Sequence, residues 1–348
     1  MRLKNVMYSL PLAACAMLPM ATVVAYGADQ GGPYSIVDRW KIGGEGGWDY
    51  LLADPGNHVL YLTHGTRVEV VDTNTGKAVG AITGLKGTHG VALDTDGKYG
   101  YISEGAGNAV VVFDRTTYEK VNSIAVGTNP DGILFEPVTK TVWAFNGRSN
   151  NATVIDAGTQ KVVATIPLSG KPEFPAADGT GAVFVNIETK NSMIRLDAKA
   201  RAVTAEWSLT GCESPSGLAI DTEHHRLFSV CDGKVMAVTD AQSGKVLKLV
   251  PIGDSPDAAG YDAKDGVAFS SNGDGTLTVV NTKGDQFNVI QTLPTQKSAR
   301  TMAFDSGTGR AYLVAAEFGP KPAATAENPK PRAMAVPGSF TVIVVGRK

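Results

Sequence analysis

The stretch Gly90–Gly127, GVALDTDGKYGYISEGAGNAVVVFDRTTYEKVNSIAVG, contains four short apolar runs separated by Gly-, Asp- and Asn-rich turns. Apolar runs of this length between such turns predict antiparallel β-strands. The four predicted strands are Gly90–Asp94, Tyr99–Ser103, Ala109–Phe113 and Val121–Val126. This stretch is therefore one four-stranded unit.

The same unit recurs along the chain. Its third strand ends in an Asp or Asn at six positions, separated by steps of 42, 42, 41, 43 and 41 residues: Asp72, Asp114, Asp156, Asp197, Asp240 and Asn281. Four-stranded units with a period of about 40 to 45 residues are typical of β-propeller blades. A small sheet of this kind needs a neighbour on each face, so the units are expected to close into a ring.

The two ends of the chain predict how the ring closes. The last unit lacks a strand after Phe340–Val345, whereas an unassigned strand, residues 34 to 43, precedes the first unit. Dividing about 320 residues by the repeat length gives about seven blades. We expect an all-β, single-domain seven-bladed β-propeller of four-stranded blades over residues 29–348, with the last blade closed by the N-terminal strand.

Composition excludes several other classes. The chain of 348 residues has 40 Gly, 18 Pro and 19% charged residues, which argues against a disordered polyampholyte and against a helical bundle. A net charge of -2 argues against nucleic acid as a partner. Motifs for covalent haem, for a serine-nucleophile elbow and for phosphate loops are absent from the sequence.

Residues 1–28 have the pattern of an export signal. Arg2 and Lys4 precede an apolar run, and small residues precede the polar sequence that starts at Asp29. We expect a periplasmic protein with no integral membrane segment, since no later apolar run approaches the roughly 20 residues that span a bilayer. An alternative is a lipoprotein signal in which Cys15 is acylated.

Repeated phrases carry a family resemblance over the whole chain after residue 28. The segments Val154–Ala157, Lys161–Ile166 and Val126–Gly132 resemble the YVTN-repeat, YncE-like propellers of bacterial envelopes. The resemblance implies a propeller. It is compatible with DNA binders, adhesins and surface-layer components, and related propellers include lactonases and lyases.

The repeat register separates the two faces of the ring. The Asp residues that end the third strands open turns on what we call the lower face, where a carboxylate accepts backbone N–H groups. His58, His224 and His225 also fall in lower turns, and the His pair would hold a metal only with further ligands.

The upper face collects the entries to the first strands and the loops between second and third strands. The entries contribute Trp48, Asp49, His89, Asp131, Glu173, Glu213, Asp257 and Arg300. From both sets of loops we select seven candidate ligand-binding residues, all expected in one funnel: His89, Arg148, Glu173, Glu188, Glu213, Arg300 and Glu317. Carboxylates bind calcium or magnesium and arginine binds anions, so Ca or Mg is the candidate cofactor. The sequence assigns no catalytic residue and no metal ligand.

Cys212 and Cys231 are expected to form a disulfide. A hairpin of the fifth unit brings both toward the upper face, and an oxidising compartment favours the bond. The alternative is a pair of thiols that hold a soft metal. The Pro-rich insertion 319–338 in the last blade is either a flap over the funnel, a partner-binding arm or a disordered insertion.

Two classes of function follow. The first is a non-enzymatic, monomeric module that binds a small polar ligand or an envelope protein through the upper funnel. The second is a metal-assisted lactonase or lyase acting on a sugar-like substrate, with Glu173, Glu188, Glu213 or Glu317 and His89 as acid/base or metal-ligating groups. DNA binding is a third alternative that rests on the resemblance alone.

Overall fold

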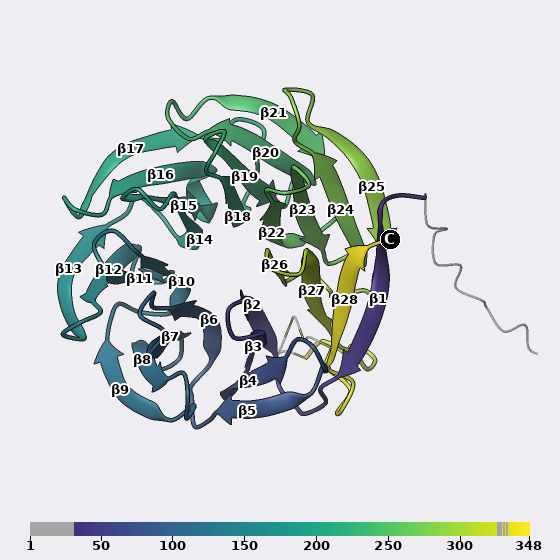
Figure 1. Cartoon of the computed structure of the whole chain (residues 1–348), viewed down its shortest axis with the longest axis horizontal. Helices are drawn as coiled ribbons and strands as arrows, with labels where there is room; N and C mark the ends of the chain where they lie inside the picture. The colour runs from purple at the N-terminus through teal and green to yellow at the C-terminus, as the bar shows by residue number, and fades with distance from the viewer. Residues whose placement is uncertain (1–30, 326–328, 330, 332) are drawn as a thin grey trace, which may run out of the picture.

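Seven four-stranded antiparallel sheets surround a central axis (Figure 1). This computed structural model describes residues 31–325, 329, 331 and 333–348. The predicted seven-bladed, all-β propeller is confirmed. The predicted export signal and Cys15 lie outside the described residues.

Each of blades 1 to 6 consists of four consecutive strands, from the innermost to the outermost. Blades 1 to 3 are β2 Trp48–Asp54, β3 Val59–His64, β4 Arg67–Asp72 and β5 Ala78–Ile82; β6 Thr88–Leu93, β7 Tyr99–Glu104, β8 Ala109–Asp114 and β9 Lys120–Ala125; and β10 Pro130–Glu136, β11 Thr141–Asn146, β12 Asn151–Asp156 and β13 Lys161–Pro167. Blades 4 to 6 are β14 Pro172–Ala177, β15 Ala182–Ile187, β16 Ser192–Asp197 and β17 Ala202–Ser208; β18 Pro215–Asp221, β19 Arg226–Cys231, β20 Val235–Asp240 and β21 Val246–Pro251; and β22 Pro256–Asp262, β23 Val267–Asn272, β24 Thr276–Asn281 and β25 Asn288–Pro294.

Blade 7 combines both ends of the described chain. Its sheet has the order β1-β28-β27-β26, formed by β1 Tyr34–Lys41, β28 Thr341–Arg347, β27 Arg310–Ala315 and β26 Met302–Asp305. Strand β1 runs antiparallel to β28 as the outermost strand. The predicted closure of the last blade by the N-terminal strand is therefore confirmed.

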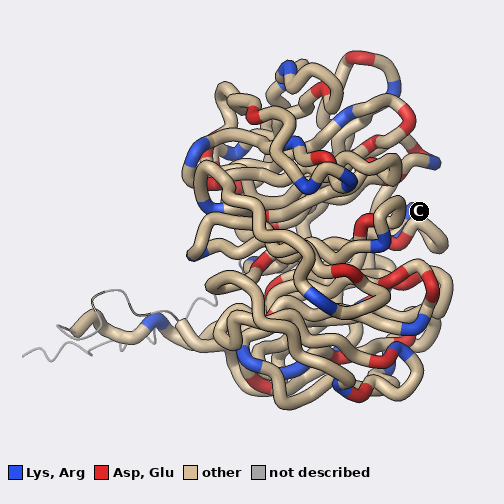
Figure 2. The backbone as a smooth tube through the Cα atoms, turned by 90° about the vertical axis from the view of Figure 1, so that its left-hand side faces the viewer, with Lys and Arg blue, Asp and Glu red and all other residues tan. Residues whose placement is uncertain are grey.

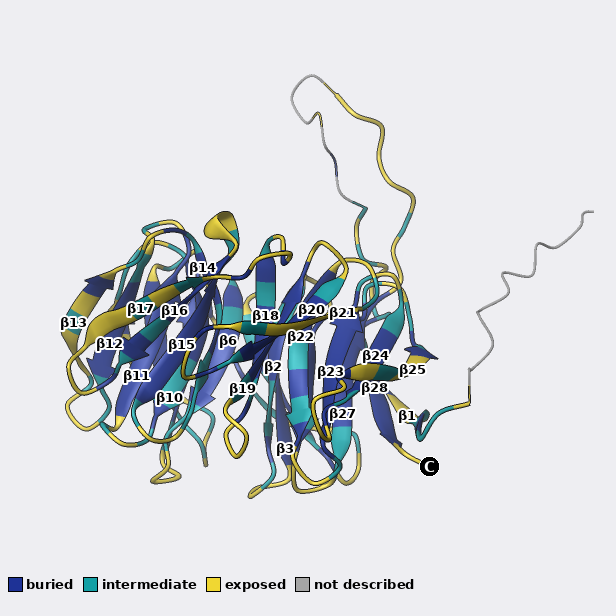
Figure 3. Cartoon of the chain, turned by 90° about the horizontal axis from the view of Figure 1, so that it is seen from above, coloured by how far each residue is buried: buried dark blue, intermediate teal, exposed yellow. Residues whose placement is uncertain are grey.

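The core lies between neighbouring blades. Tyr101 and Val110 of blade 2 pack in one cluster with Ile133 and Val142 of blade 3, and blades 1 and 7 meet in the same way. The outermost strands leave one face in solvent, as Val121 on β9 is 49% exposed (Figure 3). Packing on both faces explains why the middle strands are apolar without alternation.

The lower turns are built as the sequence predicts. Asp72 accepts backbone N–H bonds from Asn74 and Thr75, and Asp114, Asp156 and Asp240 cap equivalent turns. His224 donates from Nδ1 to Asp221 in one such turn. These carboxylates stabilise the turns of each repeat and do not form a binding site.

The insertion between β27 and β28 leaves the upper face as a narrow ribbon (Figure 3). At its base Phe318 bridges Ala335, and the backbone N–H of Gly319 donates to Met334. The predicted Cys212–Cys231 disulfide is present, with a Cα–Cα distance of 5.4 Å. Within the described residues, no helix has the length and apolar character needed to cross a membrane.

Candidate functional site

At the upper face, each blade contributes one residue at the entrance of the central channel. These seven residues, separated by 40, 42, 42, 43, 41 and 43 positions, form what we call the entry ring: Asp49, His89, Asp131, Glu173, Ser216, Asp257 and Arg300. Each of the first six is the second residue of its innermost strand, and Arg300 lies two residues before β26. The repeat therefore converges side chains that are far apart in sequence.

A local irregularity repeats at the entry ring. In blades 1 to 6 the pairing between the first and second strands shifts register at this residue, as a β-bulge does when it redirects a side chain. In three blades, a residue with positive φ and a proline precede it: Asn129-Pro130, Ser214-Pro215 and Ser255-Pro256. Glycine follows it in three blades, and a Cβ on Gly217 would lie 2.6 Å from Ala258 Cα. Neighbouring first strands approach closely at this level as a result.

Polar side chains on the second strands hold the ring backbone. Ser103 Oγ accepts the backbone N–H of Gly90 at 2.8 Å and donates to the carbonyl of Asp131 in the next blade at 2.6 Å. Asn186 Nδ2 donates to the carbonyl of Ser216 at 2.9 Å. Because these bonds link one blade to the next, the entry ring is preorganised.

Six of the seven entry-ring residues, all but His89, line a cavity of about 360 Å³, which we call the upper cavity. Its lining combines residues of the entry ring with loop residues from blades 4 and 5: Asp49, Tyr50, Asp131, Lys171, Glu173, Glu188, Ser214, Ser216, Asp232, Pro256, Asp257 and Arg300. Six of these carry carboxylates and two carry positive charges. The cavity therefore has an excess of acidic groups.

His89 joins two ring carboxylates at the edge of this cavity. Its Nδ1–H donates to Asp49 Oδ2 at 2.6 Å and lies 3.5 Å from Asp131 Oδ1. Burial lowers the pKa of His89, but the hydrogen bond to Asp49 and the charge of Asp131 outweigh it and raise this pKa to about 9. At neutral pH His89 is an imidazolium that partly balances the acids.

Glu173 belongs to a second group of charges. Lys171 Nζ donates to Glu173 Oε1 and, at 2.5 Å, to Glu188 Oε2, the latter at the start of the short helix η1 Glu188–Lys190. Burial and the charge of Asp131 nevertheless raise the pKa of Glu173 to about 8. Burial and the charge of Asp49 likewise raise the pKa of Asp131 to about 6.

Asp257 and Arg300 form the third group. Arg300 Nε lies 3.2 Å from Asp257 Oδ2, and Ser216 Oγ donates to Asp257 Oδ1 at 2.8 Å. Burial raises the pKa of Asp257 even against these partners, and burial raises that of Asp49 as well. Raised acid pKa values in all three groups indicate carboxylates that their own cations do not fully compensate.

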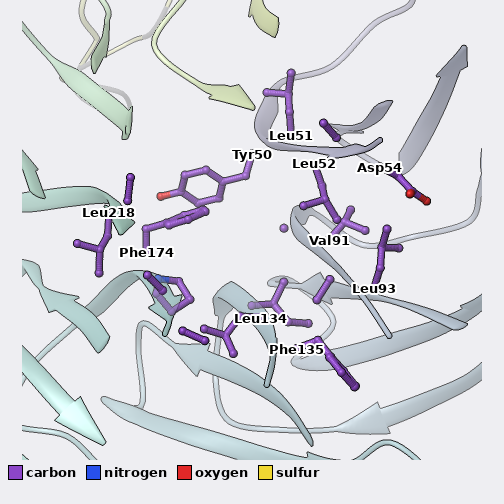
Figure 4. A pocket seen from close by; sticks show the side chains of 18 of the residues that line it. Tyr50, Leu51, Leu52, Asp54, Val91, Leu93, Leu134, Phe135, Phe174 and Leu218 are labelled. Carbon is purple, nitrogen blue, oxygen red and sulfur yellow. The ribbon is translucent and has the colours of Figure 1, made fainter. Parts of the chain in front are cut away.

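One aromatic side chain, that of Tyr50, lines the upper cavity. Tyr50 of blade 1 and Phe174 of blade 4 meet across the channel with ring centroids 4.6 Å apart (Figure 4). Tyr50 is 4% exposed and also lines a separate cavity toward the lower face. The pair therefore marks the boundary between two parts of the channel.

The structure brings together four of the seven candidate residues chosen from the sequence. Glu173, Glu188 and Arg300 line the upper cavity, and His89 contacts two of its acids. Arg148, Glu213 and Glu317 are exposed and do not line it. Arg148 lies between β11 and β12, Glu317 lies between β27 and β28, and Glu213 precedes the ring position of blade 5, which Ser216 occupies.

Sequence reasoning named Asp49, Asp131 and Asp257 as upper-face entries but left them out of the candidate set. It missed Lys171, which pairs with Glu173 and Glu188. The three aspartates could have been found from the sequence, because they fit the spacing of 40 to 43 residues between successive entry-ring positions. Nothing in the repeat marks Lys171, because its role depends on the conformation of the loop before β14.

One part of the site has the composition of a metal centre. Asp49, His89 and Asp131 each offer a ligand atom, and these atoms lie within 4.8 Å of one another. Two carboxylates and an imidazole suit a divalent cation. A metal here would replace the proton on His89 Nδ1, so metal and proton would compete.

Comparisons with known proteins identify the fold. No protein-family model and no curated protein matches the chain. Among solved structures, the WD40 repeats of RRP9 match with a TM-score of 0.73 at 12% identity, covering 91% of this chain and 99% of that one. U3-55K matches with a TM-score of 0.69 at 11% identity, covering 85% and 94%.

A third similar structure is hydrazine synthase of Kuenenia stuttgartiensis, with a TM-score of 0.68 at 16% identity, covering 84% of this chain and 96% of that chain. At these identities the structural similarity establishes the β-propeller fold and nothing about activity. Function must therefore be argued from the site.

Proposed function

We propose that this chain is a non-enzymatic, exported binding module whose upper cavity takes a positively charged ligand. The ligand is a free cation or a basic group presented by an envelope protein. The observation that carries the proposal is the excess of carboxylates in the upper cavity over Lys171 and Arg300. Since buried charges need partners, a cationic ligand would supply the missing compensation.

The protonation of the buried acids also favours a cationic ligand. In the free protein, Glu173 with its pKa of about 8 holds a proton at neutral pH. A bound cation favours the ionised carboxylate, so binding would expel that proton. Affinity for a cation should therefore rise with pH between about 6 and 9, the range in which Asp131, Glu173 and His89 titrate.

Two further observations support the envelope setting of the proposal. The Cys212–Cys231 disulfide is typical of an oxidising compartment such as the periplasm. The repeat phrases resemble those of YVTN-type envelope propellers, and we propose that the chain belongs with them. Both signs of charge are interspersed along the chain (Figure 2), which favours a local ligand over a long polyanion.

The test is calorimetric titration with calcium, magnesium and 1,4-diaminobutane. We expect at least one of these cations to bind one equivalent. Glu173→Gln or Asp131→Asn should weaken binding by about 10- to 100-fold, the usual range for losing one charged hydrogen-bond partner. Glu213→Gln is the matched control, because Glu213 is an exposed carboxylate of the same face that does not line the cavity.

Three outcomes distinguish the sources of the charge. Binding of calcium or magnesium alone identifies a metal ligand, and binding of the diamine identifies an organic base. If no cation binds, or if Glu213→Gln weakens binding as much as Glu173→Gln, the proposal is wrong.

A second candidate function is a metal-assisted hydrolase or lyase acting on a lactone or sugar-like substrate. The arrangement of Asp49, His89 and Asp131 favours it, since those residues have the composition of a divalent metal site. Glu173 would serve as the acid/base group, because a pKa of about 8 is near the pH at which such groups act best.

Metal analysis together with a panel of lactones tests this candidate. It predicts a bound divalent ion and pH-dependent ring opening that Glu173→Gln abolishes. A metal-loaded protein that opens no lactone would rule out lactonase activity and leave the binding proposal intact.

A further inference from the structure

The channel below the Tyr50–Phe174 pair contains a second cavity, of about 590 Å³. The innermost strands of blades 1 to 5 line this lower cavity, and Figure 4 shows their side chains surrounding an open centre. Its apolar lining includes Leu52, Val91, Leu93, Leu134, Phe174 and Leu218. A volume of this size falls within the range of small-molecule sites, about 300 to 1,000 Å³.

Part of the lining is less buried than the rest. Leu51 and Ile133 line the cavity but are at most 7% exposed, because they also pack between blades. Leu52, Leu93 and Leu134 are only partly buried although they lie at the centre of the ring. Their exposed apolar surface lines the lower cavity, where no neighbouring blade covers it. An apolar molecule in the cavity would remove that surface from water.

Charges at the lower rim restrict the class of ligand. Arg115 Nη2 donates to Asp54 Oδ2 at 2.6 Å, and its Nη1 donates to the carbonyl of Asp94 at 3.0 Å and lies 3.6 Å from Asp94 Oδ1. Arg115 is the only cation among the lining residues, and it faces two carboxylates. An anionic amphiphile such as a fatty acid would meet a net negative rim.

We propose that the lower cavity is a second binding site, for a neutral apolar small molecule. Its lining side chains are apolar except for Asp54, Asp94 and Arg115 at the rim and Tyr50. Among the lining residues of the two cavities, Tyr50 alone is shared. We therefore expect the lower site to bind its ligand independently of a cation in the upper cavity.

The experiment uses a matched pair of fluorescent probes on the full chain. N-phenyl-1-naphthylamine is neutral, whereas 8-anilino-1-naphthalenesulfonate has the same aromatic frame with a negative charge. We expect saturable binding of one equivalent of the neutral probe, and binding of the anionic probe weaker by about tenfold or more. That difference follows from the rim carboxylates.

Two variants of different kinds locate the probe. Leu134→Gln makes the lining polar and Ala176→Phe fills the cavity, and each should weaken binding of the neutral probe by about tenfold or more. Val138→Gln is the matched control, because Val138 is 58% exposed in the lower turn of the same blade and does not line the cavity. Melting curves check that each variant is folded.

Several results would overturn the proposal. They are the absence of saturable binding by the wild-type chain, equal binding of both probes, or an effect of Val138→Gln as large as that of Leu134→Gln. Glu173→Gln must leave the neutral probe bound as in the wild type. If it abolishes that binding, the probe occupies the upper cavity and the lower site does not exist.

Discussion

The two ends of the same innermost strands carry opposite chemistry. On β10, Asp131 lines the upper cavity, and Leu134, three residues later, lines the lower one. On β14, Glu173 lines the upper cavity and its neighbour Phe174 the lower one. Carboxylates gather at the bulged strand entries, whereas the regular part of each strand presents apolar side chains.

This contrast shows which part of a repeat can change its function. The regular part of each strand is constrained by packing between blades, so its chemistry stays apolar. At the entries of blades 1 to 6, the bulge releases one side chain per blade from that packing. These six entries can therefore present different groups at the upper face on a common scaffold.

The largest expected effect is on both cavities at once. Deletion of residues 31–43 removes β1, exposes the edge of β28 and opens the ring. We expect loss of cooperative melting, together with loss of cation and apolar-probe binding. A chain starting at Gly44 that melts like the intact one would contradict the closure.

The response to pH should be opposite for the upper cavity and the lower turns. Glu173 has its pKa raised from 4.5 to about 8, and His89 from 6.5 to about 9. The folded chain therefore binds more protons than the unfolded chain between pH 4.5 and 9, so these groups make stability fall as pH rises through that window. Hydrogen bonds from Thr75 lower the pKa of Asp72, so the lower turns lose stability only on acidification.

Thermal melting from pH 3 to pH 9 measures the loss of stability at both ends of the pH range. Glu173→Gln should reduce the fall in melting temperature at high pH. Asp156→Asn removes the charge of a lower-turn carboxylate, so it should reduce only the fall at low pH. Identical pH profiles for the wild type and Glu173→Gln would show that Glu173 does not hold a raised pKa.

The Cys212–Cys231 disulfide cross-links two segments of blade 5 at its upper end. Replacing Cys212 and Cys231 by Ser reopens a loop of 19 residues, which the chain-entropy model values at roughly 3 kcal/mol. Because Cys212 lies four residues before Ser216 in the chain, we expect a larger loss in cation affinity than in apolar-probe affinity. Denaturant unfolding and the two titrations measure these effects, and unchanged stability would contradict the expectation.

The architecture was predictable from the sequence, since it depends on repetition. Third-strand ends such as Asp114 and Asp156 mark the period, and the missing strand after Phe340–Val345 indicated the closure by residues 34–43. Cys212 and Cys231 could be paired because one hairpin joins them. Each of these inferences uses register along the chain, which a repeat defines well.

The candidate site was predictable only in part, because register says nothing about distance from the axis. Glu173 and Arg300 were found, whereas Glu213, taken as the entry residue of blade 5, is exposed three residues before Ser216. The lower cavity was not foreseen at all. Residues such as Leu134 have the same apolar character as core residues, and only the geometry of the ring leaves them partly uncovered.

A double-mutant cycle tests whether the two cavities bind independently, and we expect the coupling between them to be small. For each ligand, the loss of binding free energy in the double variant Glu173→Gln/Leu134→Gln should equal the sum of the losses in the two single variants. We expect agreement to within about 0.5 kcal/mol, as for independent sites. Titrations of the single and double variants form the cycle. A coupling energy above 1 kcal/mol would mean that the Tyr50–Phe174 pair links the cavities instead of dividing them.

Proton release on cation binding is the most direct test of the central claim, that the upper cavity exchanges protons for a positive ligand. A pH-stat at pH 7 would record the release during saturation with the tightest-binding cation of the panel. The account predicts release of at least one proton per chain, because Glu173 is protonated below its pKa of about 8, and release of about one proton less in Glu173→Gln. Saturation without proton release, or no binding of any cation, would contradict the account.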